Sequence, residues 1–143
     1  MILGLTQKDL EEGARLVHAA VAPTPQYRWP LLDVGAGLEV WVKHENHTPT
    51  GSFKVRGGLT LIDHLKRENP RLAGVISATR GNHGQSVAFA GRRHGLRSVI
   101  VVPHGNSREK NAAMRAWGAE LIEHGRDYDE AREHAHALSK KQG

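Results

Sequence analysis

Cysteine is absent from this chain of 143 residues. Its absence excludes disulfide bonds, thiolate metal sites and cysteine nucleophiles, although it leaves the redox compartment undetermined. Long hydrophobic runs are also missing, because apolar strings such as 98–102 fall far short of the roughly 20 residues that a membrane-spanning helix requires. The N-terminal stretch MILGLTQKDLEE lacks the basic start and apolar core of a secretory signal. We therefore expect a cytoplasmic protein without a membrane partner.

The chain is moderately basic, with a formal net charge of +5. The basic pairs are scattered near expected helix C-termini, where cations complement the helix dipole: Lys66–Arg67, Arg92–Arg93 and Lys140–Lys141. This placement favours solvated helix ends over a nucleic-acid surface, and the sequence contains no motif typical of DNA or RNA binding. We expect no nucleic-acid partner. A composition with 38% hydrophobic and 24% charged residues is ordinary for a soluble globular domain.

The first half of the chain is expected to alternate between regular elements and connections. Thr6 and Asp9 form an N-cap signal for the first helix, and three prolines then prevent its continuation. The expected elements are a helix over 7–21, an extended connection over 22–37, a strand over 38–43, a loop over 48–52 and a helix from about 53 that ends before Pro70.

The second half repeats a strand-then-helix unit. Short apolar strands are expected at 74–77, 99–102 and 120–122. The helices that follow them are expected at 82–94, at 108–117 with Ser107 as its cap, and at 128–141 with Asp127 and Glu130 as a capping pair. Uninterrupted apolar strands that alternate with helices are typical of a parallel sheet covered on both faces. The fold class is therefore α/β, with a parallel sheet flanked by helices.

A glycine-rich loop, SATRGNHGQS at 77–86, follows one of these strands and opens a helix. Ligands of open α/β sheets bind at this end of the strands. Asn82 with Gln85 has a purely structural interpretation as a helix cap. Gly81 and Gly84, however, leave N–H groups uncovered, as in sites that receive a carboxylate or a phosphate. Both interpretations remain open on the sequence.

A single lysine, Lys54, lies in the first turn of the helix that follows the loop TPTGS. The positive end of the helix dipole disfavours an ammonium and favours the nucleophilic amine, which suits a Schiff base with a carbonyl compound. The alternative is an ordinary surface lysine.

Together, TGSFKVRGG and SATRGNHGQSVAFA resemble the lysine motif and the asparagine loop of fold-type II pyridoxal-phosphate enzymes. The combination is similar to the threonine/serine dehydratase and serine racemase family, and the resemblance extends over essentially the whole chain. It implies a tryptophan synthase beta-like fold, incomplete here, and pyridoxal 5'-phosphate as cofactor. It also implies a division at 1–52 and 53–143, between the N-terminal part of a large domain and a linking helix with a small α/β domain.

The resemblance assigns roles to individual residues. Lys54 is implied to bind the cofactor covalently and to carry the Cα proton, Phe53 to pack on the cofactor ring and Asn82 to hydrogen-bond the ring oxygen. The implied substrate-binding residues are Ser77, Thr79, Arg80, Gly81 and His83. The implied reaction is β-elimination from a hydroxy amino acid of the threonine or serine type, which gives a 2-oxo acid and ammonia.

Arg80 departs from the family pattern, since relatives carry a small residue before the glycine and racemases a serine that acts on the opposite face of the substrate. This departure weakens a racemase interpretation. It motivates the hypothesis that Arg80 pairs with a second carboxylate of the substrate. The alternative is an arginine that points to solvent or pairs with a nearby acid.

The sequence also lacks the glycine-rich phosphate-binding run of the family. We therefore expect weak cofactor binding and little activity from this chain alone, and a homodimer for a full-length enzyme. Racemisation, β-replacement and a non-catalytic fragment remain alternatives. Histidine pairs at 44 and 47 and at 134 and 136 lack a predictable metal geometry, so no metal site is expected.

Overall fold

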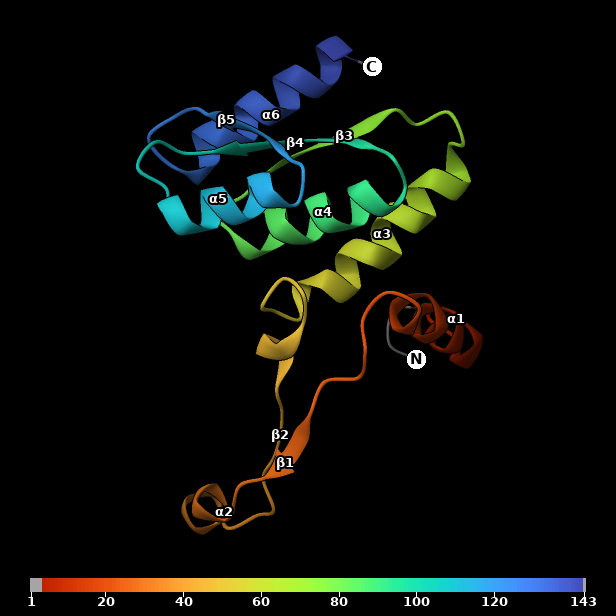
Figure 1. Cartoon of the computed structure of the whole chain (residues 1–143), viewed down its shortest axis with the longest axis vertical. Coiled ribbons are helices and arrows are strands. Elements are labelled where there is room, and N and C mark those ends of the chain that lie inside the picture. The colour runs from red at the N-terminus through yellow and green to blue at the C-terminus, as the bar shows by residue number, and fades with distance from the viewer. Residues whose placement is uncertain (1–3, 143) are drawn as a thin grey trace. The chain divides into compact units, whose positions relative to one another are not determined.

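The computed structural model describes residues 4–142, without the side chain of residue 142. The chain divides into two compact units, one up to Phe53 and one from Lys54 onward (Figure 1). Within the described residues, none of the helices combines the length and the apolar character needed to cross a bilayer.

The first unit begins with α1 (Gln7–His18). The predicted N-cap is confirmed: the N–H of Asp9 donates to the hydroxyl of Thr6, and the N–H of Thr6 donates to the carboxylate of Asp9 at 2.7 Å. The helix ends at His18 rather than at residue 21 as predicted. Val17 in this helix and Val21, three residues after its end, are buried.

The stretch 22–37 was expected to be an extended connection, and this prediction was wrong. It contains the strand β1 (Gln26–Arg28) and the helix α2 (Pro30–Ala36), and β1 pairs antiparallel with β2 (Trp41–Lys43). Pro30 starts α2 because the first helical position needs no N–H donor. Gly37, at φ +66°, ends the helix in the left-handed conformation that glycine adopts without strain.

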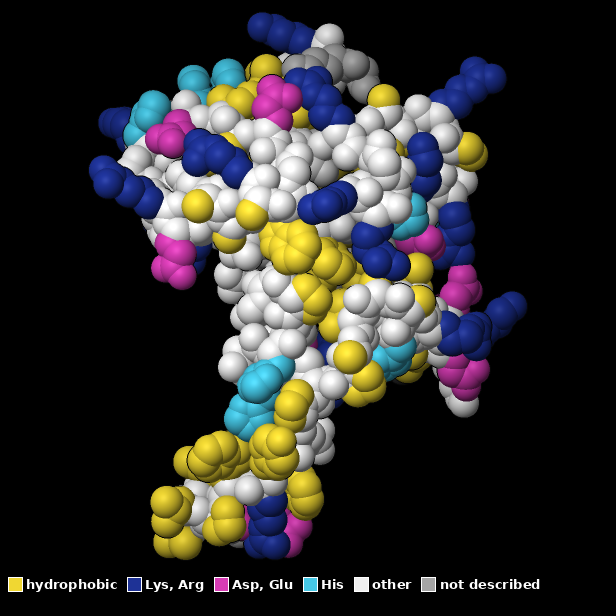
Figure 2. Space-filling model, viewed as in Figure 1, with side chains coloured by type: hydrophobic (Ala, Val, Ile, Leu, Met, Phe, Trp, Pro, Cys, Tyr) yellow, Lys and Arg dark blue, Asp and Glu magenta, His cyan; other side chains and the backbone are white. Residues whose placement is uncertain are grey.

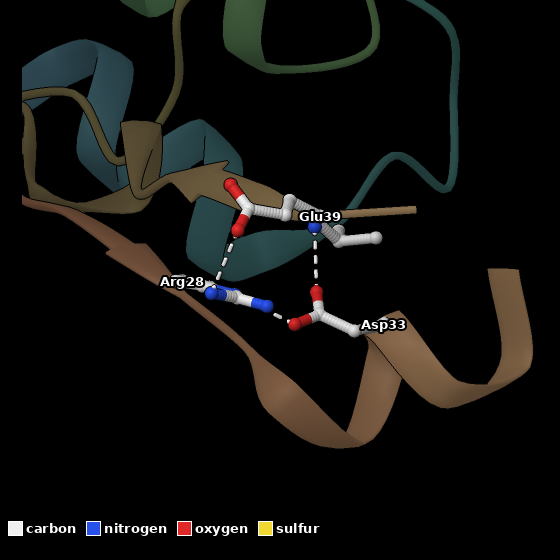
Figure 3. Close-up of polar contacts among 4 residues, drawn as sticks. Arg28, Asp33 and Glu39 are labelled. Carbon is white, nitrogen blue, oxygen red and sulfur yellow. Dashed lines mark hydrogen bonds and ion pairs between the residues drawn. The ribbon is translucent and has the colours of Figure 1, made fainter. Parts of the chain in front are cut away.

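A polar cluster holds α2 to β1 and to the residues just before β2 (Figure 3). The guanidinium of Arg28 lies between two carboxylates, at 2.7 Å from Asp33 and 2.8 Å from Glu39. The second oxygen of Asp33 accepts the N–H of Val40 at 2.6 Å. That backbone hydrogen bond, followed by the pairing with Arg28, keeps the pKa of Asp33 below its usual value despite partial desolvation.

Apolar side chains gather over α2 and the β1–β2 hairpin, as the yellow surface in Figure 2 shows. The large exposed members of this apolar surface are Tyr27, Trp29, Leu31, Leu32, Val34, Leu38 and Trp41. The first unit therefore keeps much of its apolar surface in contact with solvent. A 3-10 turn at Glu45–His47 leads from β2 into the loop 48–53.

The second unit begins with α3 (Lys54–Glu68) and continues with a three-stranded parallel sheet in the order β3-β4-β5. The strands are β3 (Gly74–Ala78), β4 (Arg97–Val102) and β5 (Glu120–Glu123). The helices between and after them are α4 (Asn82–Arg93), α5 (Arg108–Ala116) and α6 (Tyr128–Gln142). The predicted α/β class with a parallel sheet is confirmed, and the element boundaries agree with the expected ones within about two residues.

Helices cover both faces of this sheet (Figure 1). On one face, Ile100 and Val102 of β4 pack with Met114 of α5 and with residues of α4. On the other face, Val101 packs with Ala131 and Ala135 of α6. Successive residues of β4 thus face opposite layers, and those from Ser98 to Val102 are all buried, which explains the unbroken apolar run at 99–102.

Candidate active site

The helices α3 and α4 approach closely one turn after each begins. A Cβ on Gly58 of α3 would lie only 2.8 Å from the carbonyl oxygen of Ser86 in α4. Gly58 lies four residues after Lys54, and Ser86 lies four residues after Asn82. The close contact therefore brings the N-terminal ends of both helices, with Lys54 and Asn82, to the same region of the unit.

The start of α4 is organised by Thr79 rather than by Asn82. The buried hydroxyl of Thr79 accepts the N–H of Gly81 at 3.0 Å and the N–H of Gly84 at 3.3 Å. Gly81 is the N-cap residue and Asn82 the first residue of the helix, so the capping pair considered for Asn82 and Gln85 is wrong. A hydroxyl that enters from the end of β3 satisfies these donors instead.

Because Thr79 takes over the capping, Asn82 is available for other contacts. The side chain of Asn82 is exposed and forms no hydrogen bond with the residues described. The N–H groups of Asn82 and His83, at the first two helical positions, have no intrahelical acceptor. The start of α4 thus presents two N–H donors and one carboxamide, at the positive end of a helix dipole.

Gly84 lies on the packed side of the same helical turn. A Cβ at this position would come within 2.5 Å of both the sulfur of Met114 and Cγ2 of Thr79. The lack of a side chain lets α4 lie close to β4 and α5, so this glycine fixes the position of the loop.

His83 provides an electrostatic indication of where Lys54 lies. Its pKa is lowered below 6.5, chiefly by desolvation and secondarily by the positive charge of Lys54. The ammonium of Lys54 is therefore near enough to the start of α4 to affect it. His83 is neutral at neutral pH and can accept or donate a hydrogen bond.

Ser77 lies in β3 between Ile76 and Ala78, which pack toward α6. Ser77 and His83 both line an open hollow of about 300 Å³, whose opposite wall is formed by side chains of α6. The predicted residues Lys54, Ser77, Thr79, Arg80, Gly81, Asn82 and His83 thus belong to one unit, around the carboxyl end of β3 and the starts of two helices.

Lys110 is a residue that the sequence did not single out. A Cβ on Gly81 would lie 2.6 Å from Cδ of Lys110 and 3.3 Å from its Cε, so the lysine side chain crosses the loop where Gly81 has no side chain. Lys110 lies in the first turn of α5. The one available signal was its position shortly after β4, at the same edge of a parallel sheet.

The loop that precedes Lys54 belongs to the first unit. Thr48 closes it: its hydroxyl donates to the carbonyl of Ser52 and accepts the N–H of Ser52, both at 2.9 Å. The hydroxyls of Thr50 and Ser52 are buried without a hydrogen-bond partner among the described residues. Phe53, the predicted ring-packing residue, is 58% exposed. The segment therefore holds two unsatisfied hydroxyls and an exposed aromatic ring next to Lys54 in the sequence.

The histidine pairs form ring contacts. His44 packs against the rings of Tyr27, Trp29 and His47. His134 does not pair with His136 but stacks on His124, with ring centroids 3.8 Å apart. Within residues 4–142, no group of three or more metal-ligating side chains is found.

Comparisons with known proteins agree with this geometry. The family described as "Pyridoxal-phosphate dependent enzyme" matches residues 17–143. The chain is 38% identical to the biosynthetic L-threonine dehydratase of Haemophilus influenzae over 90% of this chain and 25% of that protein. It is 37% identical to the L-threonine ammonia-lyase of Thermotoga maritima over 97% of this chain and 34% of that protein.

Among solved structures, a pyridoxal 5'-phosphate-dependent aspartate racemase superposes with a TM-score of 0.90 at 33% identity, covering 98% of this chain and 44% of that one. The chain thus spans between a quarter and less than half of the length of these relatives.

Proposed function

Because the chain belongs to the family of pyridoxal-phosphate-dependent enzymes, we propose that it forms part of an ammonia-lyase that eliminates the β-hydroxyl of an amino acid. The products are a 2-oxo acid and ammonia. The threonine dehydratase of Haemophilus influenzae and the threonine ammonia-lyase of Thermotoga maritima support this reaction class.

The observation that carries the proposal is the placement of Lys54. It is the first residue of α3, and its charge acts on His83 at the start of α4. An amine and an anion-accepting helix start are therefore close together in one unit. This is the combination required to hold a molecule that carries both a carbonyl or amine centre and a carboxylate.

The residues present fit pyridoxal phosphate and an amino acid. Lys54 offers the amine, and Asn82 offers a carboxamide that no described residue engages. When bound, pyridoxal phosphate supplies an aldehyde for amines and an electron-accepting ring.

Each residue of the site would then have a separate role. The amine of Lys54 would hold the cofactor's aldehyde carbon and, once released by the substrate amine, accept the Cα proton. The carboxamide of Asn82 would hydrogen-bond the ring oxygen, while the N–H groups of Asn82 and His83 receive the substrate carboxylate. Thr79 keeps these donors in place, and Phe53 is proposed to pack on the ring.

Racemisation is the second candidate, because the aspartate racemase shares the fold closely. A racemase needs a proton acceptor on each side of Cα. Arg80 occupies the position where such an acceptor is expected, and a guanidinium keeps its proton at neutral pH. This argument favours elimination. The predicted homodimer, the cytoplasmic location and the large-domain and small-domain assignment of 1–52 and 53–143 stay predictions.

Covalent trapping tests the assignment of Lys54. The purified protein is treated with pyridoxal phosphate and borohydride, and the labelled lysines are mapped by mass spectrometry. We expect Lys54 to be labelled first, and Lys54→Met to lose this label. Lys8→Met is the matched control, because Lys8 also lies in the first turn of an exposed helix. Labelling spread evenly over the exposed lysines would contradict the proposal.

Turnover provides the second test. Formation of a 2-oxo acid from serine or threonine is measured in a cofactor-loaded full-length enzyme that contains this chain, because little activity is expected from the chain alone. We expect Lys54→Met to abolish the activity and Lys8→Met to keep it. Interconversion of enantiomers without release of ammonia would favour the racemase instead.

A further inference from the structure

Arg80 occupies a distinctive electrostatic position in the candidate site. It lies between Thr79, whose N–H donates to Val101 at 3.0 Å, and Gly81, which is buried. Its backbone is thus held on both sides, whereas its side chain is exposed. Among the described residues, the guanidinium of Arg80 has no hydrogen-bond or ion-pair partner. A planar fork of five N–H donors remains available at the mouth of the loop.

Lys110 adds a second cation beside it. The stem of Lys110 crosses Gly81, which directly follows Arg80 in the sequence, and Cε lies 3.3 Å from the Cβ position of that glycine. The ammonium of Lys110 likewise has no partner among the described residues. Two unpaired cations therefore flank the start of α4.

Acidic side chains do little to balance these charges. Neither α3 nor α4 has an acidic residue in its first turn, and α5 has Glu109 there. Arg80 and Lys110 together carry two positive charges, one more than the single carboxylate of serine or threonine can neutralise. The N–H groups of Asn82 and His83 suffice for one carboxylate, which leaves Arg80 and Lys110 for another anionic group.

We propose that Arg80, assisted by Lys110, binds a second carboxylate on the substrate side chain, so that the enzyme prefers a dicarboxylic hydroxy amino acid. This inference rests on the proposed function and names its substrate class. 3-Hydroxyaspartate is the simplest member of that class. It keeps the β-hydroxyl that leaves, and loss of water followed by hydrolysis gives a four-carbon 2-oxo dicarboxylic acid and ammonia. The loop that holds one carboxylate would thus hold the second as well.

A binding experiment without cofactor tests the subsite separately from turnover. The protein is titrated with 3-hydroxyaspartate, and in parallel with threonine, while the ¹H–¹⁵N signals of Gly81, Asn82 and the Arg80 side chain are followed. We expect 3-hydroxyaspartate to bind at least about 10-fold more tightly than threonine, as for a charge-assisted pair. Equal affinities, or no shift of these signals with either ligand, would overturn the proposal.

Charge-neutral variants identify the residues responsible. Arg80→Gln is expected to remove most of the preference for 3-hydroxyaspartate. Lys110→Gln should weaken it by a smaller factor, because Lys110 only assists Arg80; glutamine keeps Cγ and Cδ over Gly81 and removes the charge. Arg93→Gln is the control, since it removes the same charge from the far end of α4 and should leave the preference unchanged. An equal loss in the Arg93 variant would mean a nonspecific charge effect and would overturn the subsite.

Two further arms separate the alternatives. Inorganic phosphate is titrated in the same way. If it shifts the Arg80 signals and 3-hydroxyaspartate does not, the cations serve a phosphate group and the proposal is wrong. Trapping at Lys54 reports on the proposed function independently. Failed trapping with a retained dicarboxylate preference would remove the lyase assignment but keep the subsite, whereas the reverse result would remove the subsite alone.

Discussion

The two units of the chain differ in how their apolar side chains are used. In the second unit, Ile100, Val101 and Val102 of β4 are each 0% exposed, because helices cover both sheet faces. In the first unit, Leu31, Val34 and Leu38 are 88%, 85% and 73% exposed. Its elements are linked by local polar contacts, such as those of Thr6, Asp33 and Thr48, and its buried hydrophobic residues are Val17 and Val21. A packed core therefore supports the candidate site, while the first unit leaves an apolar surface uncovered.

The largest expected effect comes from core truncation. Ile100→Ala should cost about 2–5 kcal/mol of unfolding free energy, because it leaves a cavity between α4, α5 and the sheet. Leu31→Ala, in the first unit, should change stability by no more than about 0.5 kcal/mol. Urea unfolding combined with hydrogen exchange of peptides from β4 measures both. Similar losses in the two variants would mean that the exposed surface of α2 is covered in solution.

Glycines sharpen the contrast between the units. Gly58→Ala should destabilise by about 1–3 kcal/mol, because the new methyl meets the backbone oxygen of Ser86, which cannot rotate away. Its neighbour Gly57 has open space around it, and Gly57→Ala should stabilise by up to about 1 kcal/mol. In the first unit, Gly37 is constrained by φ +66° and not by packing, so Gly37→Ala should cost about 1 kcal/mol.

Shifts of the urea midpoint rank these three variants. A neutral Gly58→Ala would mean that α3 and α4 can separate without cost. The close approach that brings Lys54 to the start of α4 would then lose its structural basis.

The same contrast explains what the sequence predicted well. The βα repeat was predictable because both faces of the sheet are buried, so residues 99–102 of β4 form an unbroken apolar run and each helix has a clear start and stop. The stretch 22–37 was mispredicted because its exposed apolar residues carry no amphipathic period. Pro30 was interpreted as a break, although at the first helical position it begins α2.

Those parts of the candidate site that depend on local sequence alone were predictable. Lys54 and the loop 77–83 could be located, because helix starts that follow strands are recognisable. The cap formed by Thr79 and the side chain of Lys110 across Gly81 could not, since both depend on tertiary contacts between separate elements. Sequence spacing does not contain that information.

The smallest expected effect is a shift in the pKa of His83, with the fold unchanged. Lys54→Met should raise the pKa of His83, because the lysine charge is one of the two causes that lower it. Desolvation remains, so the pKa should stay below 6.5. Ring signals of His83 in an NMR titration measure the shift. Asp33 is the internal control: its pKa is set mainly by the N–H of Val40 in the other unit and should not move.

The sign of the accompanying pH dependence follows from proton binding. Below pH 6.5, the unfolded chain binds a proton at His83 more readily than the folded chain does, so stability falls as the pH drops from 6.5 toward the lowered pKa. Lys54→Met reduces the difference between the pKa of His83 in the folded chain and in the unfolded chain. The variant should therefore lose less stability than the original protein as the pH falls. Asp33 contributes at lower pH, because its lowered pKa stabilises the fold above pH 3.8 and that contribution disappears on further acidification.

If the pKa of His83 does not respond to Lys54→Met, the amine and the start of α4 are not neighbours in solution, and the arrangement on which the catalytic proposal rests is lost.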